Sequence, residues 1–216
     1  SSLLEVSGPL ALGMFLVGCC PGGGMSNFFT QQANGNIALS VAVTAFSSSL
    51  AAILLPVNFI FWSGLYGESA NILEAIEIDR VEFLLTIIMI LAIPLIIGLW
   101  MRAKHERFAL KLLKPIRVFS MVVLATFIVL GIVGNARLFE EYLSMVFWLV
   151  LLHNATALGL GFFSARAVGL PIGDQKAISL EVGIQNSALG LAIIFSFFDG
   201  NGYMAMIAAW WGVWHL

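Results

Sequence analysis

The stretch GCCPGGGMSN, from Gly18 to Asn27, interrupts a strongly apolar part of the sequence. Pro21 lacks a backbone N–H donor, and the three glycines that follow it weaken any helix. At membrane depth, broken backbone persists only where protein buries it or where it lines an aqueous cavity. We therefore expect a helix that is interrupted within the membrane, although a re-entrant turn or an extramembrane loop would also fit this stretch alone.

The composition of the whole chain is that of an integral membrane protein. Of its 216 residues, 60% are hydrophobic and 10% are charged, and the mean hydropathy is +0.99. Soluble domains are about 45–50% apolar and about 25% charged, so a soluble enzyme and a disordered protein are excluded. Ten basic residues against 12 acidic ones leave no basic surface for nucleic acid. The adjacent Cys19 and Cys20 form neither a disulfide framework nor a metal motif.

Apolar runs divide the chain into several predicted helices. A helix that crosses a bilayer needs about 20 mostly apolar residues. Because the chain starts with Ser and ends inside an apolar run, we expect a fragment that lacks helices at its start and a short piece at its end. In order, the runs are Pro9–Cys20, Ile37–Leu65, Val81–Met101, Ile116–Val133, Tyr142–Phe163, Ala177–Phe198 and Tyr203–Leu216.

The basic residues predict how these helices are oriented. Six of the ten lie in or beside the segment 102–117, and two more lie in the loop Arg166–Lys176. By the positive-inside rule, 102–117 faces the cytoplasm, with a solvated interfacial helix at Ala103–Lys114, and the loop Gly67–Arg80 faces the opposite side. The loops on that opposite side hold two basic residues and collect six acidic ones: Glu68, Glu74, Glu77, Asp79, Glu140 and Glu141.

A second interruption reads SLEVGIQNSALG, from Ser179 to Gly190. Glu181 is the one acidic residue deep inside an apolar run. A charge at the centre of a spanning helix costs roughly 2.5–3.5 kcal/mol, which makes such a residue a functional candidate. Gln185 follows on the same helical face, and Gly183 eases unwinding between them. A protonated Glu181 could also serve as a hydrogen-bonding contact between helices, but Gln185 and Asn186 beside it favour a functional role.

Hydroxyl side chains gather on the helix after the first interruption. Ser40 and Thr44 lie at i and i+4, a pattern that is also typical of helix packing in membranes. Two interrupted runs, each followed by another span, are typical of inverted-repeat transporters whose broken helices cross near the midplane. Hydroxyl, amide and carboxylate oxygens, without His or thiolate, suit an alkali cation better than a transition metal.

Three runs resemble motifs of the bile acid:sodium symporter family, which includes bacterial homologues. They are GCCPGGGMSN at Gly18–Asn27, GNIALSVAVT at Gly35–Thr44 and LPIGDQKAISLEVGIQNSALG at Leu170–Gly190. The resemblance implies an all-α integral membrane protein with ten helices in two inverted repeats, partly truncated here, with two crossing broken helices. Residues 1–65 would be core-domain helices of the first repeat, 81–134 panel-domain helices, and 141–216 core-domain helices of the second repeat.

The resemblance also implies two sodium sites that share Glu181. A bridging carboxylate would offset the repulsion between two nearby cations. A further second-site ligand of the family, a Gln on the third helix, would precede Ser1, so the second site would be incomplete here. The first site would use Ser26, Asn27, Ser40, Thr44 and Glu181, and the second would use Glu181, the carbonyls of Val182 and Ile184, and the side chain of Gln185.

The function implied is sodium-coupled symport of an organic anion by alternating access. An intramembrane enzyme is a competing hypothesis, but the sequence has no paired Asp, Ser/His pair or zinc motif and no cofactor motif, since Asp174 and Asp199 fall on opposite sides in the predicted topology. We therefore expect no enzymatic activity, no cofactor other than co-transported sodium, no nucleic acid partner, and a place in the bacterial inner membrane or its equivalent. Proton coupling, metalloid efflux and a non-transporting membrane subunit are further alternatives. The sequence adds two weaker expectations: substrate contacts at Asn186, His153 and Asn154, and an interfacial tryptophan belt at Trp210, Trp211 and Trp214.

Overall fold

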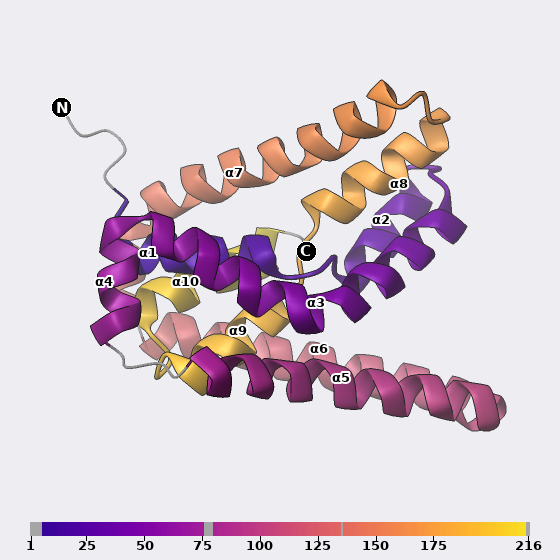
Figure 1. The fold of residues 1–216 in the computed structure, drawn as a ribbon, viewed down its shortest axis with the longest axis horizontal. Helices are drawn as coiled ribbons and strands as arrows, with labels where there is room; N and C mark the ends of the chain where they lie inside the picture. Colours follow the sequence, from indigo (N-terminus) through magenta and orange to yellow (C-terminus); the bar gives the residue numbers. More distant parts are fainter. Residues whose placement is uncertain (1–5, 76–79, 135, 215–216) are drawn as a thin grey trace.

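A computed structural model describes residues 6–75, 80–134 and 136–214 as a helical assembly (Figure 1). Glu77 and Asp79 of the predicted acidic loop lie outside the described residues. The helices are α1 (Gly8–Cys19), α2 (Gly24–Gln32), α3 (Ile37–Leu65), α4 (Gly67–Ala75), α5 (Arg80–Lys104), α6 (Glu106–Gly134), α7 (Ala136–Ala167), α8 (Ile172–Gly183), α9 (Ser187–Phe197) and α10 (Gly202–Trp214).

The predicted apolar runs are helical. The run 37–65 coincides with α3, and the runs 81–101, 116–133 and 142–163 lie inside the longer helices α5, α6 and α7. Among the described residues, three helical segments are long and apolar enough to cross a membrane: α3, residues 81–104 of α5, and α7. The helices α1 and α9 are apolar but shorter. The described part of the chain is therefore all-helical, with several segments that are long and apolar enough to cross a membrane.

The segment between the third and fourth runs differs from the expectation. The predicted interfacial helix at Ala103–Lys114 is wrong as a separate element, because α5 continues to Lys104 and α6 begins at Glu106, with His105 between them. Lys, Arg and Leu are strong helix formers, so both helices continue beyond their apolar parts. The predicted loop 67–80 likewise contains a helix, α4.

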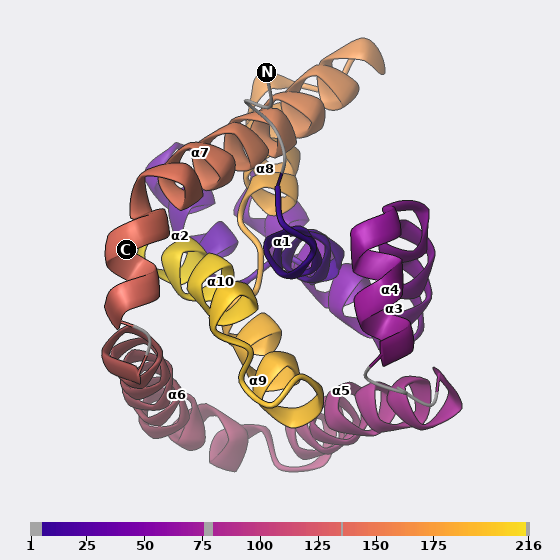
Figure 2. The same ribbon diagram turned by 90° about the vertical axis from the view of Figure 1, so that its left-hand side faces the viewer.

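The helices α1, α9 and α10 form the centre of the molecule, and α3 to α7 surround them (Figure 2). Leu12 of α1, Ile194 of α9 and Met206 of α10 are fully buried. A Cβ at Gly13 would lie 3.0 Å from the Cα of Met204, so this glycine permits the close approach of α1 to α10. The packed helices α1 and α9 adjoin the two interruptions, so this centre holds one end of each interruption in place.

The expected interfacial tryptophan belt is wrong for Trp211, which is enclosed by protein. Trp211 is 0% exposed and its ring centroid lies 5.2 Å from that of His153. Trp210 and Trp214 both pack against Phe147 of α7, with ring centroids 6.3 Å and 5.7 Å away. Sequence composition could not distinguish a belt from a core position, because α10 is apolar on every side.

The two interruptions lie against each other, as expected. The backbone N–H of Gly23 donates to the carbonyl of Ile184 (2.9 Å), and that of Asn186 donates to the carbonyl of Pro21 (3.0 Å). Gly22 and Gln185 are thereby paired in an antiparallel manner. Backbone groups that leave a helix in an apolar surrounding need partners, and here each interruption supplies them to the other.

The position of the second interruption is shifted from the prediction. The glycine in this motif predicts non-helical backbone at Val182–Ile184, but Val182 and Gly183 still belong to α8, and the non-helical residues are 184–186. The proline and glycines of the first motif predict non-helical backbone at Pro21–Gly24, but Gly24 already begins α2. Helix α8 continues because the buried side chain of Asn154 on α7 donates to the Gly183 carbonyl (2.6 Å) and so caps its end.

A polar clasp joins the turn between α2 and α3 to the start of α8. The backbone N–H of Asn36 donates to the Gly173 carbonyl (2.9 Å), and its side chain donates to Asp174 (2.8 Å). The ammonium group of Lys176 donates to the Ala33 carbonyl at the end of α2 (2.8 Å). Cations stabilise helix C-termini, so this clasp fixes α2 and α3 relative to α8.

Candidate ion-binding site

Glu181 lies near the end of α8, beside the paired interruptions, and is 4% exposed. Its Oε2 atom lies 2.6 Å from the hydroxyl of Ser26 on α2 and 2.9 Å from the hydroxyl of Thr44 on α3. Within the described part of the chain, its Oε1 atom is buried without a hydrogen-bond partner. A buried carboxylate is costly unless a cation or hydrogen-bond donors compensate it, and these two hydroxyls compensate only one of its oxygens.

The oxygens around Glu181 outnumber the protons available to them. The Ser26 hydroxyl lies 2.7 Å from the Gly23 carbonyl as well as close to Glu181, yet it carries one proton. The Thr44 hydroxyl likewise faces the Ser40 carbonyl at 2.9 Å in addition to Glu181. Such a concentration of oxygens with too few protons is the arrangement that a hard cation satisfies.

The remaining residues expected at the first site adjoin this cluster. The Asn27 amide nitrogen donates to the Thr44 hydroxyl (3.1 Å), and the Asn27 carbonyl oxygen lies 3.4 Å from the same hydroxyl. Ser40 is fully buried one turn before Thr44. The structure thus brings Ser26, Asn27, Ser40, Thr44 and Glu181 together from three helices.

Sequence reasoning missed Thr30, whose hydroxyl donates to that of Ser40 (3.2 Å). Thr30 is fully buried, and it follows Ser26 by four residues on α2. That i, i+4 spacing places both side chains on one face of the helix and was the available signal. The contact orients the Ser40 oxygen toward the cluster.

Thr30→Val is expected to raise the Na+ concentration that gives half-maximal uptake by about two- to tenfold, because one buried hydrogen bond contributes about 0.5–1.5 kcal/mol. Thr30→Ser keeps the hydroxyl and should restore the wild-type value. Thr156→Val is the matched control, since the Thr156 hydroxyl is exposed and bonds only within α7. A Thr30→Val protein with unchanged sodium dependence would contradict this role.

The residues expected at the second site lie at the second interruption. The Val182 carbonyl accepts from the side-chain nitrogen of Gln185 (2.9 Å), and the Ile184 carbonyl accepts from Gly23. The Gln185 side-chain oxygen is buried and, among the described residues, has no hydrogen-bond partner. Gln185 was expected on the same helical face as Glu181, but it lies beyond the end of α8. A second ion at these atoms stays a prediction.

The three expected substrate contacts have different surroundings. The side-chain nitrogen of Asn154 donates to the Gly183 carbonyl, and its side-chain oxygen accepts from the indole N–H of Trp214 (3.3 Å). Asn186 caps the start of α9 by accepting from the Leu189 N–H (3.1 Å). Both asparagines thus stabilise the ends of helices at the second interruption, and direct contact of either with a substrate stays a prediction.

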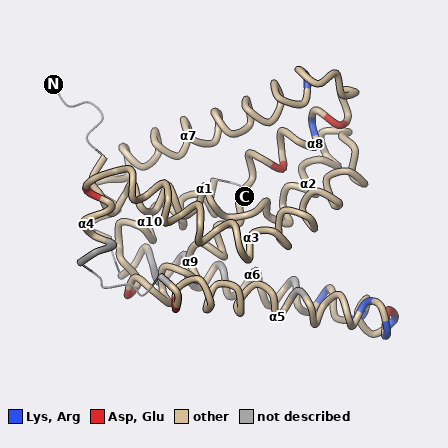
Figure 3. The backbone as a smooth tube through the Cα atoms, viewed as in Figure 1, with Lys and Arg blue, Asp and Glu red and all other residues tan. Residues whose placement is uncertain are grey.

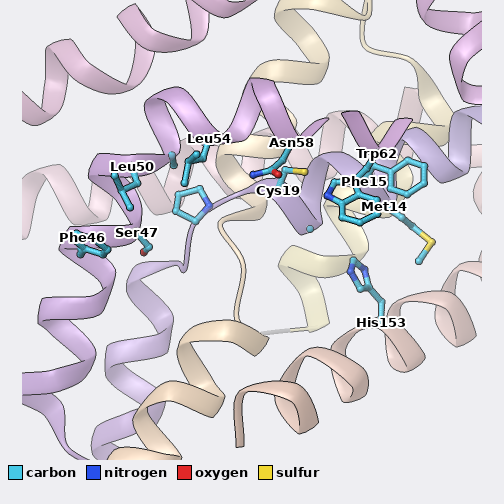
Figure 4. Close-up of a pocket in the computed structure, with 13 residues that line it drawn as sticks. Met14, Phe15, Cys19, Phe46, Ser47, Leu50, Leu54, Asn58, Trp62 and His153 are labelled. Atoms are coloured by element: carbon cyan, nitrogen blue, oxygen red, sulfur yellow. The ribbon is translucent and has the colours of Figure 1, made fainter. Parts of the chain in front are cut away.

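His153 lines a cavity of about 580 Å³ between α1, α3 and α7 (Figure 4). It points from α7 toward side chains of α1 and α3 that include Cys19, Asn58 and Trp62. Its Nδ1 atom is buried and, in the part of the chain that the structure describes, has no hydrogen-bond partner. The walls are mainly apolar with a few polar groups, as in sites that bind small organic molecules.

Gly22 is a second residue whose role the sequence did not reveal. A Cβ at this position would overlap Oε1 of Glu181 and would lie 2.7 Å from its carboxyl carbon. The glycine therefore lets the first interruption pass directly beside the carboxylate. At Gly24, by contrast, a Cβ would meet nothing within 4 Å.

This arrangement agrees with comparisons to known proteins. The family model described as the sodium bile acid symporter family matches residues 1–141. The chain belongs to the sodium bile acid symporter family. A Bacillus subtilis protein named "Uncharacterized sodium-dependent transporter YocS" is 31% identical over 212 residues, which cover 98% of this chain and 63% of that protein.

Two further relatives of this symporter family are named as cotransporters. The Arabidopsis thaliana protein "Probable sodium/metabolite cotransporter BASS1, chloroplastic" is 32% identical over 97% of this chain and 50% of its own length. The Cricetulus griseus "Ileal sodium/bile acid cotransporter" is 29% identical over 85% of this chain and 51% of its own length. The chain therefore spans about half to two thirds of these relatives, whose names describe transporters rather than enzymes.

Proposed function

We propose that this chain forms the ion-binding part of a secondary active transporter that couples sodium entry to uptake of an organic anion. The observation that carries the proposal is the group of oxygens around Glu181, which holds more acceptors than protons and a carboxylate oxygen that no described residue pairs. Na+ prefers such hard oxygen ligands. The family and its sodium-dependent relatives support the same assignment.

We also propose that the first ion binds to Ser26, Asn27, Ser40, Thr44 and Glu181, and a second to Glu181, Val182, Ile184 and Gln185. If two Na+ accompany one monoanion, one net positive charge moves inward. The membrane potential would then add roughly 2.3 kcal/mol per 100 mV to the driving force. A carboxylate common to both sites would make binding of the two ions interdependent.

The fold proposed for the complete protein is the ten-helix arrangement of two inverted repeats with core and panel domains. The pairing of the α1–α2 interruption with the α8–α9 interruption supports it, because each repeat would contribute one broken helix. In this arrangement the segment 102–117 faces the cytoplasm. Labelling of a cysteine at Lys104 by an impermeant maleimide on intact cells would contradict that orientation.

The organic anion is proposed to bind in the cavity beside the first interruption, where His153 supplies a polar contact within apolar walls. A carboxylate or sulfonate with an apolar body would match this lining. Relatives are named for bile acid and for an unspecified metabolite, so both classes belong in a substrate panel.

The decisive experiment is uptake of radiolabelled carboxylates and sulfonates by cells that express the full-length protein. We expect at least one compound to enter only when Na+ is present, and to stop entering when K+ or choline replaces Na+. Uptake that persists without Na+ and responds to an imposed pH gradient would instead establish proton coupling. Absence of uptake for every compound, with the protein correctly inserted, would favour a non-transporting subunit.

A further inference from the structure

The joined ends of α5 and α6 carry a concentration of positive charge that the ion site does not use. Figure 3 shows Lys and Arg side by side where the two helices meet, away from the other helices. Between residues 102 and 114 the sequence holds five basic residues and a single acidic one, Glu106. All five basic side chains are exposed: Arg102, Lys104, Arg107, Lys111 and Lys114.

An apolar cavity of about 510 Å³ lies between α5 and α6 directly beside this charge. Its lining includes Pro94, Gly98, Leu110 and Leu113, and Arg102 is the one charged residue among the side chains that line it. Leu110 and Leu113 are more than half exposed. The volume falls within the range of about 300–1,000 Å³ that is typical of small-molecule sites.

Gly98 leaves room within this cavity. A Cβ at this position would meet nothing within 4 Å, although Gly98 lies inside α5 and lines the cavity. A glycine inside a helix is destabilising by roughly 0.5–1 kcal/mol relative to alanine. No close packing against another described helix explains the glycine here, and a larger side chain at this position would take up part of the cavity.

We propose that the end of the α5–α6 pair is a binding site for one anionic phospholipid. An acyl chain occupies the apolar cavity between the helices, and the phosphate of the headgroup lies against Arg102. The neighbouring basic residues contribute to the charge that selects an anionic headgroup over a zwitterionic one. Basic pockets between membrane helices recognise lipids by this combination of charge and apolar surface.

The ligand is a membrane lipid rather than a soluble anion because the two halves of the site have different chemistry. A soluble phosphate would use the basic residues and leave the apolar cavity unfilled. An uncharged hydrocarbon would fill the cavity and leave Arg102, the one charged lining residue, without a counter-charge. A molecule with an anionic head and an apolar chain satisfies both parts at once.

The test is native mass spectrometry of the full-length protein in detergent, with phosphatidylglycerol and phosphatidylcholine of identical acyl chains as probes. We expect phosphatidylglycerol to bind more tightly. Arg102→Gln should weaken phosphatidylglycerol binding about fivefold, since a basic residue at a membrane surface contributes about 1 kcal/mol, and should leave phosphatidylcholine binding unchanged. Gly98→Leu should fill the cavity and weaken both lipids at this site.

Two matched variants serve as controls. Gly64→Leu places the same side chain on an exposed face of α3, where a Cβ also meets nothing within 4 Å. Arg166→Gln removes an exposed positive charge from the end of α7. Neither control should change lipid binding.

Three outcomes would overturn the proposal. The first is equal affinity for both lipids in the wild-type protein, and the second is unchanged binding in Gly98→Leu and Arg102→Gln. The third is a Gly98→Leu protein with a lower melting temperature but unchanged lipid binding, which would show that protein rather than lipid fills the cavity. These outcomes are independent of sodium transport, so they leave the proposed function unaffected.

Discussion

Glu181→Gln is expected to abolish Na+-dependent uptake by the full-length protein while the protein still inserts and folds. Glutamine keeps the shape of the side chain and can accept from Ser26 and Thr44, whose hydroxyls now lie 2.6 Å and 2.9 Å from the carboxylate. It removes the negative charge that would pair with the ion. Loss of one partner of a buried ion pair costs about 3–5 kcal/mol, so uptake at a fixed Na+ concentration should fall more than about a hundredfold.

The control for this variant is Asp174→Asn on the same helix. Asp174 accepts from Asn36 in the clasp at the start of α8, and asparagine retains an oxygen for that contact. Uptake by this variant should remain close to wild type. Robust sodium-dependent uptake by Glu181→Gln, at equal surface expression, would show that the carboxylate does not hold the ion.

Gly22→Ala is also expected to reduce Na+-dependent uptake strongly, although it changes neither charge nor any hydrogen-bonding side chain. The added methyl group would overlap the Glu181 carboxylate, which must then move away from Ser26 and Thr44. Overpacking of this kind typically costs about 1–3 kcal/mol. We expect Na+-dependent uptake to fall by about 5- to 150-fold and the rise in melting temperature on addition of Na+ to become smaller.

Gly24→Ala is the matched control, because a Cβ two residues further along meets nothing within 4 Å. It should retain uptake and the sodium-dependent rise in melting temperature. If both alanine variants lost uptake equally, a general need for flexible backbone in the interruption would explain the result. If neither did, the close approach of Gly22 to the carboxylate would be unimportant for ion binding.

That the residues of the candidate site lie together was largely predictable from sequence. Pro21 with the glycines after it, and a single acidic residue inside an apolar run, each contradict an uninterrupted membrane helix. Where a helix is interrupted inside an apolar surrounding, its free backbone N–H and C=O groups need hydrogen-bond partners, and a second interruption in the same chain can supply them. The observed hydrogen bonds of Gly23 with Ile184 and of Asn186 with Pro21 are of this kind.

Other features depend on contacts between segments that are distant in sequence. The second interruption begins two residues later than predicted because Asn154, from another helix, caps the Gly183 carbonyl. Gly22 contacts Glu181, but the two residues are far apart in sequence, so no local sequence pattern predicts this contact. Trp211 was wrongly predicted to lie at the membrane interface for a similar reason, since an apolar helix does not reveal which neighbours enclose it.

The hydrogen bonds between the two interruptions have a mechanical consequence. They tie the inner ends of α1, α2, α8 and α9 to one joint, and the clasp of Asn36 and Lys176 ties α2 and α8 together a second time. Pulling these short helices apart would break both connections and separate the residues of the candidate ion site. If an ion binds here as proposed, its ligands would stay together during transport only if this unit moved as one rigid body against the rest of the protein.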